Sequence, residues 1–435
     1  MSRFRQLLAD QRGNVAVITA LMILPMLVLA GGATDIARYE TFRAQLQDGV
    51  DRAVLASASL TQGMGVEATA AEYLKSVSFI QDVDLDYDYS VALNNKRVTI
   101  TARYDMATGF LPLIGIRTME VVAKASAEEH LKNLEISLML DMSGSMLDGT
   151  PSRISLLRPA AKNFIDAMIT PEMAPYTSIS IVPYAGSVNP GATAFGILGT
   201  VRQHNYSSCI EFDNNTDYAK GMVPFNLRAQ VPHFTQNHVA NPPGKEWAYC
   251  PYEATSITYL SNNATALKAR IDSIKLHDGT GTAVATNWGL LLLDPSARPF
   301  VGKMSAVGAV PGRFSNRPAN FNDGETVKII VLMTDGEISA QRRPTQYAFP
   351  RNPEGQNNDL QSQSNAAKTL LAVCDYAKSK NVIVYTIGFD LGNSGKSDMS
   401  YCASSPGHFY DVEGLDIATA FQSIARSIQR IKLTQ

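Results

Sequence analysis

The sequence predicts an α/β protein, in which most of the chain forms a doubly wound, mainly parallel sheet with flanking helices. Two observations predict this class. The runs 136–140 and 329–333 are almost wholly apolar, which is typical of strands that are covered on both faces. Helical stretches separate these runs from other apolar segments, and this alternation predicts right-handed βαβ crossovers.

Composition sets broad limits on the function. The chain has 435 residues, enough for two or three domains, and 45% of them are hydrophobic, enough to fill their cores. The formal net charge of −2 gives no electrostatic reason to expect a nucleic-acid partner.

The N-terminus has the pattern of a membrane anchor. Residues 1–13 contain three arginines and one aspartate, whereas residues 14–34 contain no charge. About twenty apolar residues match the roughly 30 Å hydrocarbon core of a bilayer. The arginines that precede the span favour a cytoplasmic N-terminus and an external location for the rest of the chain. We therefore predict a cytoplasmic segment at 1–13 and a transmembrane helix at 14–34.

Two kinds of processing are alternatives to a retained anchor. A cleaved secretory signal would have a shorter apolar core than this chain has. A prepilin-type peptide cut after Gly13 would normally be accompanied by a glutamate at the position of Ile18. The retained anchor is the favoured prediction.

A helix is predicted to continue beyond the span. Apolar residues recur at helical spacing from Asp35 to about Leu60 and form one stripe. The stripe consists of Ile36, Tyr39, Phe42, Leu46, Val50 and Val54. Together with the start Arg12-Gly-Asn-Val-Ala-Val17, this arrangement resembles the TadE/TadG-like segment of bacterial tight-adherence (Flp) pilus proteins.

Residues 80–128 change to a period of two. The acidic residues Asp82, Asp84, Asp86 and Asp88 alternate with apolar residues, which predicts a strand with one solvated face. A turn at 94–96 and a strand from Arg97 predict a β-hairpin, and 119–126 is predicted to add a strand. The helix and these strands are expected to form a small α+β module over 35–130.

The domain predicted for 131–435 contains the alternating elements. Helices are expected at 156–168, with Pro159 in the first turn, and at 366–377 and 417–431. Further strands are expected at 178–184, 382–389 and 408–412. The alternation is lost over about 186–265, which we interpret as an insertion, and 299–325 is expected to be a loop.

The first apolar strand ends in a group of hard oxygen donors. Asp141, Ser143 and Ser145 alternate directly after it, so an extended loop would place their side chains on one side. A carboxylate and hydroxyls suit Mg²⁺, and also Mn²⁺ or Ca²⁺. Asp335 follows the second apolar strand, and ligands in such sheets bind beyond the C-terminal strand ends. The segment 277–289 lies between the two strands in the sequence and is predicted to be a glycine- and threonine-rich loop that runs into an apolar helix.

These residues resemble the metal-ion-dependent adhesion site of von Willebrand factor A domains, whose pattern is Asp-x-Ser-x-Ser, then a Thr, then an Asp. The resemblance implies a domain of that fold and a bound divalent cation, with Mg²⁺ expected first. Thr280 and Thr282 each follow a glycine, so both are candidates for the threonine. The implied ligands are Asp141, Ser143, Ser145, Thr280 or Thr282, and Asp335.

The C-terminal part of the chain also resembles the A domains of TadG-like pilus-assembly proteins. The resemblance is carried by the run Cys402-Ala-Ser-Ser-Pro-Gly-His-Phe-Tyr-Asp411, by the final helix from Phe421, and by Val182-Pro-Tyr-Ala-Gly-Ser-Val-Asn189.

Four cysteines allow three pairings, and their spacing favours Cys209 with Cys250 and Cys374 with Cys402. Such bridges persist in an oxidising compartment, in agreement with the predicted topology. Free thiols, or a zinc site that joins Cys209 and Cys250 to His204 or His233, are the alternatives.

Taken together, these resemblances imply a component of a tight-adherence pilus or adhesion system that binds proteins and is not an enzyme. Its predicted location is the bacterial inner membrane, with a single span and the C-terminal domain in the periplasm. The expected partner is a pilus or envelope protein that offers a carboxylate to the metal. The alternative is a metal-dependent hydrolase of the envelope, although the chain has no Gly-x-Ser-x-Gly, His-Glu-x-x-His or P-loop motif.

Overall fold

The computed structural model describes residues 14–60, 62–91, 95–214, 216–235, 248–345, 357–414 and 416–433. The chain forms two compact units, residues 1–131 and 132–435. The predicted cytoplasmic segment 1–13 and Asn94 of the predicted turn lie outside the described residues.

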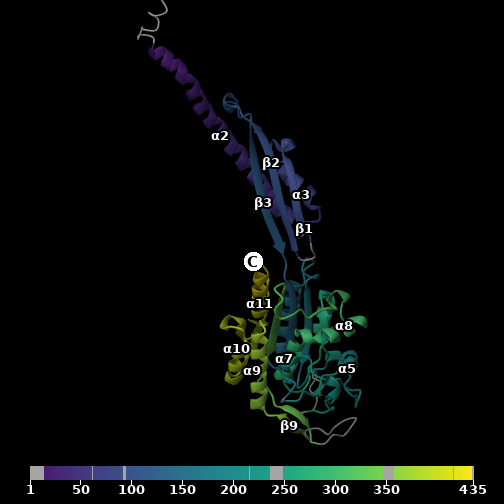
Figure 1. Ribbon diagram of the computed structural model, residues 1–435. Helices are drawn as coiled ribbons and strands as arrows, with labels where there is room; N and C mark the ends of the chain where they lie inside the picture. Colours follow the sequence, from purple (N-terminus) through teal and green to yellow (C-terminus); the bar gives the residue numbers. More distant parts are fainter. Residues whose placement is uncertain are drawn as a thin grey trace, which may run out of the picture. The chain divides into compact units, whose positions relative to one another are not determined.

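In the first unit, one long helix packs against an antiparallel sheet with the strand order β1-β2-β3 (Figure 1). Helix α2 runs from Asn14 to Ala58 and includes Pro25 within its length, so the charge-free span and the amphipathic stretch form one continuous helix. The remaining elements are α3 (Val66–Leu74), β1 (Asp84–Val91), β2 (Asn95–Ala107) and β3 (Thr118–His130).

The amphipathic part of α2 covers the sheet of this unit. Leu46, Val50 and Val54 are almost completely buried in a core that includes Val98 and Ile100 of β2. The predicted stripe begins later than expected, because Ile36 is half exposed. In β1 the aspartates from Asp84 onwards are exposed, as the alternation predicts.

The second unit has the predicted doubly wound, mainly parallel sheet, with the strand order β11-β10-β7-β4-β5-β6. All neighbouring strands are parallel except β6, which pairs antiparallel with β5 at one edge. The strands are β4 (Asn133–Asp141), β5 (Thr177–Tyr184), β6 (Thr258–Ser261), β7 (Thr326–Thr334), β10 (Ile383–Phe389) and β11 (Phe409–Val412).

Helices cover the sheet in two groups. Helices α6 (Ala264–Ser273) and α11 (Asp416–Leu433) pack on α4 (Arg153–Met168), whereas α7 (Thr282–Leu291) and α10 (Asn393–Cys402) pack on α9 (Gln363–Ser379). Outside these groups lie α5 (Ala192–Leu198), α8 (Arg298–Ala306) and a ribbon of β8 (Gln341–Pro344) and β9 (Asn357–Gln361). This is the von Willebrand factor A-type architecture that the sequence predicts.

Strand β4 is buried along nearly its whole length, which explains its apolar sequence. Ser137, the exception in that run, donates its hydroxyl hydrogen to the carbonyl of Gly289 at 2.7 Å and so connects the strand to α7. A Cβ at Gly289 would lie 2.3 Å from Met139 Sδ, so the Met139 side chain occupies the space that this glycine leaves open. This close packing fixes the loop that precedes α7 beside the end of β4.

Several expectations about elements are wrong. Helix α4 begins at Arg153, so Pro159 lies inside the helix and not in its first turn. At this interior position the proline removes one backbone hydrogen bond of the helix. The expected loop at 299–325 begins with most of helix α8, whose Pro299 occupies the first turn. Within 186–265 the chain also returns to the sheet, because β6 forms its edge.

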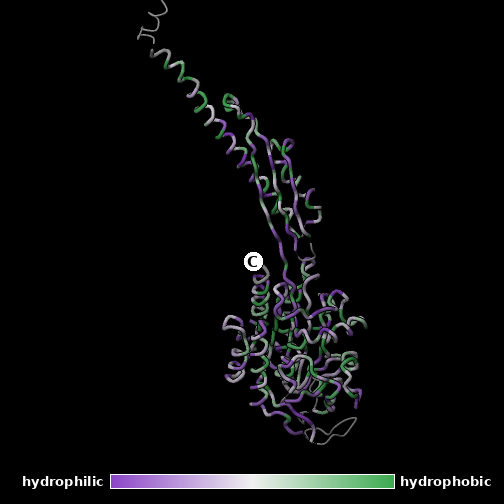
Figure 2. The backbone as a smooth tube through the Cα atoms, in the orientation of Figure 1, coloured by the Kyte–Doolittle hydropathy of each residue, from purple (hydrophilic) through white to green (hydrophobic). Residues whose placement is uncertain are grey.

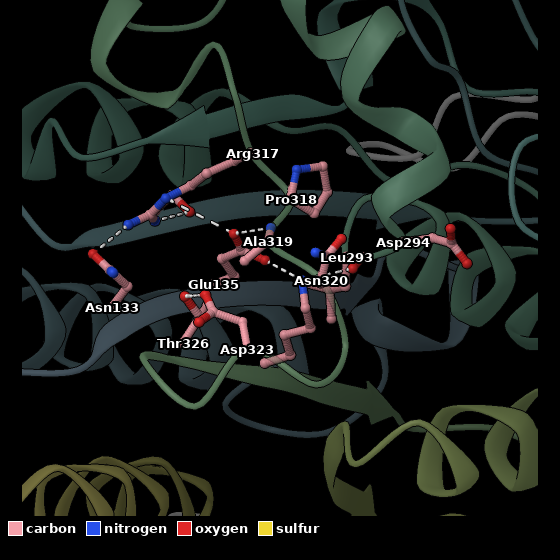
Figure 3. Close-up of polar contacts among 12 residues, drawn as sticks. Asn133, Glu135, Leu293, Asp294, Arg317, Pro318, Ala319, Asn320, Asp323 and Thr326 are labelled. Atoms are coloured by element: carbon pink, nitrogen blue, oxygen red, sulfur yellow. Dashed lines mark hydrogen bonds and ion pairs between the residues drawn. The ribbon is translucent and has the colours of Figure 1, made fainter.

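The N-terminal ends of β4 and β7 carry a buried ion cluster (Figure 3). The Glu135 carboxylate accepts hydrogen bonds from the Lys328 ammonium and from the backbone N–H of Ala319, the latter at 2.8 Å. Arg317 Nε lies 3.8 Å from Glu135 Oε1, and its terminal nitrogens donate to Asn133 Oδ1 at 3.1 Å and to Ser178 Oγ at 2.6 Å. The cluster joins the starts of these two central strands.

Candidate metal centre

Two neighbouring parallel strands bring the predicted carboxylates together. Asp141 is the last residue of β4, and Asp335 directly follows β7. The register pairs Leu140 with Met333, so strands β4 and β7 end at the same level of the sheet. Both side chains are buried, with exposed fractions of 0% for Asp141 and 3% for Asp335.

The loop after β4 turns its hydroxyls towards Asp335. Ser145 Oγ donates to Asp335 Oδ1 at 2.7 Å, and Ser143 Oγ lies 3.4 Å from the same oxygen. The two serine hydroxyl oxygens are 2.9 Å apart. Asp141 Oδ1 accepts the backbone N–H of Ser143 at 2.8 Å, which holds the start of this loop against the strand end.

The two candidate threonines occupy different positions. Thr280 is buried, and a Cβ built on Gly336 would lie 3.9 Å from its hydroxyl oxygen and 3.7 Å from Ser145 Oγ. The hydroxyls of Thr280 and Ser145 therefore both lie near Gly336. Thr282 begins α7 and is completely buried, and its side chain faces the Tyr184 hydroxyl.

Burial makes the negative charge of this site costly. Burial raises the pKa of Asp141, and the nearby charge of Asp335 raises it further. The pKa of Asp335 is also raised by burial, against the hydrogen bonds from Ser145 and Arg153. The pKa of Tyr184, whose hydroxyl lies 3.5 Å from Asp141 Oδ2, is raised well above its usual value by burial and by the Asp141 charge.

Three further residues of the site were not found from the sequence. Thr334 donates its hydroxyl hydrogen to Asp141 Oδ2 at 2.7 Å, and the Tyr184 hydroxyl donates to the carbonyl of Met333 at 2.9 Å. The strand ends contain the signal for both, because Thr334 and Tyr184 are the last residues of β7 and β5.

Arg153 is the third of these residues, and its guanidinium lies on the far side of Asp335. It donates to Asp335 Oδ2 at 3.0 Å and to Asp390 Oδ2 at 3.1 Å. Each oxygen of Asp335 thus has its own partners, hydroxyls at Oδ1 and a cation at Oδ2. No local motif marks this arginine, because the contact joins residues 182 positions apart.

The donor set fits a small hard cation. Six oxygens around Mg²⁺ at 2.0–2.1 Å would lie roughly 2.9 Å apart along each edge of the octahedron. The oxygens of Ser143, Ser145 and Asp335 are separated by 2.7 to 3.4 Å. Among the described residues, no three His, Cys, Asp or Glu side chains gather to hold a metal.

The cysteine pairing is confirmed. Cys209 is bonded to Cys250, and Cys374 is bonded to Cys402. The alternatives of free thiols and of a zinc site at Cys209 and Cys250 are therefore wrong, because all four sulfurs are used in the bridges.

Comparison with known proteins identifies a family in the N-terminal segment. Residues 13–60 match the model of the family described as putative Flp pilus-assembly TadE/G-like. No curated protein matches the chain.

The solved structures that match this chain include pilus proteins. The pilus adhesin SpaC from Lactobacillus rhamnosus GG is 12% identical with a TM-score of 0.38; the match covers 81% of this chain and 35% of SpaC. The chain thus spans about a third of that adhesin. The vWF domain of the type V pili tip protein Mfa5 from Porphyromonas gingivalis is 12% identical with a TM-score of 0.37, and 70% of this chain and 98% of that domain are covered.

A third similar structure is the proximal thread matrix protein 1 from the mussel byssus with a zinc-occupied MIDAS motif. It is 12% identical with a TM-score of 0.31, and 68% of this chain and 46% of that chain are covered. Residues 13–60 of this chain are thus similar to the TadE/G-like pilus-assembly family, and the second unit has the von Willebrand factor A fold.

Proposed function

We propose that this protein is a membrane-anchored, metal-dependent protein-binding component of a tight-adherence (Flp/Tad) pilus assembly or adhesion system. The observation that carries the metal dependence is the meeting of Asp335 with the hydroxyls of Ser143 and Ser145 beside Asp141. The TadE/G-like segment at residues 13–60 supports the link to a pilus system.

In this proposal the cation is held by Asp141, Ser143, Ser145, Asp335 and a threonine at 280 or 282. Mg²⁺ is the expected ion, and Mn²⁺ and Ca²⁺ share its preference for oxygen ligands. Asp141 and Asp335 supply the negative charge, and the serine and threonine hydroxyls add uncharged oxygen ligands. Thr334 and the Ser143 amide hold Asp141 in place from the protein side.

The function follows from an incomplete shell. A divalent cation bound here would present an open position to an acidic side chain of a partner protein. The partner is therefore expected among pilus or envelope proteins, and recognition requires a carboxylate at the contact. The role is one of binding rather than catalysis.

The proposed location is the bacterial inner membrane. Helix α2 contains an apolar stretch long enough to cross a bilayer near the N-terminus. Large apolar side chains on it, among them Leu21, Met26 and Leu29, are exposed by two thirds or more, as expected of a surface covered by lipid. We place the second unit in the periplasm, where its two disulfides would persist.

Calorimetry of Mg²⁺ and Mn²⁺ binding to the full chain in detergent tests the metal site. We expect binding that is lost in Asp141→Ala and in Asp335→Ala. Asp148→Ala is the matched control, because this exposed acid lies in the same loop but outside the proposed shell. Equal binding by all four proteins, or none by the native chain, would contradict the proposal.

A pair of isosteric variants identifies the threonine. Thr280→Val and Thr282→Val each remove one hydroxyl and keep the shape of the side chain. The variant with the weaker affinity marks the ligand.

A turnover assay with model esters and phosphates addresses the hydrolase alternative: the native protein should show no turnover above Asp141→Ala.

A further inference from the structure

The first unit carries an ordered apolar loop between β2 and β3. Residues 107–116 contain no charge, and a short 3₁₀ turn spans Leu111–Ile114. Four large side chains of this loop are exposed: Phe110 by 42%, Leu113 by 60%, Ile114 by 56% and Ile116 by 43%. Figure 2 shows the hydrophobic colour at this end of the hairpin.

The loop is closed by its own hydrogen bonds, so it cannot bury these side chains by collapsing. The amide of Ile116 donates to the carbonyl of Leu111 at 3.1 Å, and the Thr108 hydroxyl donates to the carbonyl of Ile116 at 2.7 Å. Gly115 allows the turn, because its φ of +92° lies in the left-handed region. The apolar side chains are therefore held at the surface.

Asp35 fastens this loop to helix α2. Its carboxylate accepts the backbone N–H groups of Gly109 at 2.9 Å, Phe110 at 2.8 Å and Leu111 at 3.0 Å. Asp35 is the first charged residue after the charge-free span and is only 1% exposed. The charge that would otherwise end the span is thus used to position the loop.

The contact continues along the helix into the span itself. A Cβ on Gly31 would lie 2.2 Å from Phe110 Cγ, and one on Gly32 would lie 3.2 Å from Leu111 Cδ2. These two glycines leave room for the loop to lie directly on the helix. Gly31 is 17 residues after Asn14, or roughly 26 Å along a helix that rises 1.5 Å per residue. This depth corresponds to the outer boundary of a bilayer core of about 30 Å.

We propose that the loop 107–117 is a second membrane contact, which inserts Phe110, Leu113, Ile114 and Ile116 into the outer interface of the phospholipid bilayer that α2 crosses. The inference rests on the proposed membrane anchor. The apolar surface of the span and that of the loop are continuous through the Gly31 contact, so one bilayer covers both. Arg117, which is exposed directly after the apolar run, lies where lipid phosphates would be.

Fluorescence of the full chain in phospholipid vesicles tests this contact. All four native cysteines are in disulfides, so a single new cysteine can carry an environment-sensitive nitrobenzoxadiazole label. Leu113→Cys probes the loop and Leu21→Cys probes the span. Met64→Cys is the matched control, because Met64 is also half exposed but follows the opposite end of α2.

We expect lipids with a nitroxide on the acyl chain to quench the label at 113 several-fold more strongly than the label at 64, with a blue-shifted emission at 113. Equal quenching at 113 and 64, with strong quenching at 21, would overturn the loop contact and leave the anchor intact. No quenching at 21 would overturn the anchor and the loop contact with it. A blue-shifted emission at 113 that appears only at a high protein-to-lipid ratio, without quenching by the nitroxide lipids, would assign the loop to a contact with a second copy of the chain. This result would also overturn the proposal.

Discussion

At the scale of single residues, the two oxygens of Asp335 decide how the site can respond to a cation. Oδ1 faces the hydroxyls of Ser143 and Ser145, whereas Oδ2 is paired with the Arg153 guanidinium at 3.0 Å. The side chain of Arg153 is only 19% exposed, so solvent screens its charge incompletely. Arg153 therefore offsets part of the negative charge that the site would offer to a metal.

Replacing Arg153 with glutamine should strengthen Mg²⁺ binding by roughly tenfold, because it removes a positive charge that repels the ion across one carboxylate. Calorimetry of the native chain and Arg153→Gln measures this directly. Lys162→Gln, which removes the same charge from a more exposed position on α4, should leave the affinity unchanged. Weaker binding by Arg153→Gln would show instead that the arginine holds Asp335 in place.

His277 gives the protein a dependence on pH. Its Nε2 accepts the backbone N–H of Tyr252 at 3.1 Å, and its Nδ1 lies 3.0 Å from the carbonyl of Lys275. These partners fix the neutral ring with its proton on Nδ1. Burial lowers the pKa of His277 from 6.5 to about 4, so the unfolded chain takes up a proton more readily than the folded chain.

Stability from this residue is therefore complete above pH 6.5 and is lost as the pH falls towards 4. The loss should reach up to roughly 3 kcal/mol of unfolding free energy. Thermal unfolding between pH 4 and 7 measures it. Because carboxylates titrate in the same range, the comparison is with His277→Gln, whose melting temperature should fall less over this interval. Parallel curves for the two proteins would refute the assignment.

At the scale of elements, Asp35 joins α2 to the loop between β2 and β3 through three backbone amides. These three hydrogen bonds from one buried side chain hold residues 109–111 against the helix.

Asp35→Ala should release the loop, and the amides of residues 109–111 should exchange with solvent roughly tenfold faster. Hydrogen exchange of the full chain in detergent, followed by mass spectrometry, reports on these residues. Glu40→Ala is the matched control on the same helix, because Glu40 is exposed and pairs only locally with Arg43. Equal exchange in both variants would mean that the turn within the loop is sufficient to order it.

The buried cluster at the starts of β4 and β7 makes a second prediction about elements. Glu135 and Lys328 each have side chains 3% exposed, so Glu135→Met leaves two cations, Lys328 and Arg317, without their acid. This substitution should lower the unfolding free energy by about 3–5 kcal/mol and lower the melting temperature. The double variant Glu135→Met/Lys328→Met should lose less unfolding free energy than Glu135→Met, because it removes one negative and one positive charge. Asp272→Met, at an exposed pair, should cost under about 1 kcal/mol.

Local sequence patterns predicted most elements, but not the contacts between them. The apolar runs of β4 and β7 and the alternation in β1 were sufficient to place those strands, because burial on two faces or one leaves a period in the sequence. Helix α8 was missed because its Pro299 and Gly302 read as loop residues, although Pro299 lies in the first turn.

The same limit applies to the site. Asp141, Ser143 and Ser145 are close in sequence and follow an apolar strand, so a motif reveals them. The contact of Arg153 with Asp335, and that of Tyr184 with the end of β7, depend on the folded sheet. No periodicity in the sequence indicates these two contacts, because they join residues that lie 182 and 149 positions apart.

At the scale of the whole molecule, the chain consists of two compact units with separate cores, and every proposed metal ligand belongs to the second, residues 132–435. A ligand stabilises only the structure that must be folded to bind it. At a concentration of 100 times its Kd, a cation adds about 2.7 kcal/mol to the unfolding free energy of that structure.

Mg²⁺ should therefore slow hydrogen exchange in β4, β7 and α7 by up to roughly a hundredfold and leave β2 and β3 unchanged. The measurement is hydrogen exchange of the full chain in detergent with and without Mg²⁺, read separately for peptides of each unit. Asp141→Ala/Asp335→Ala should show no response in either unit. Protection that spreads into β2 and β3 would mean that the metal site is thermodynamically coupled to the first unit. Protection confined to the second unit means that the first unit is folded independently of metal binding.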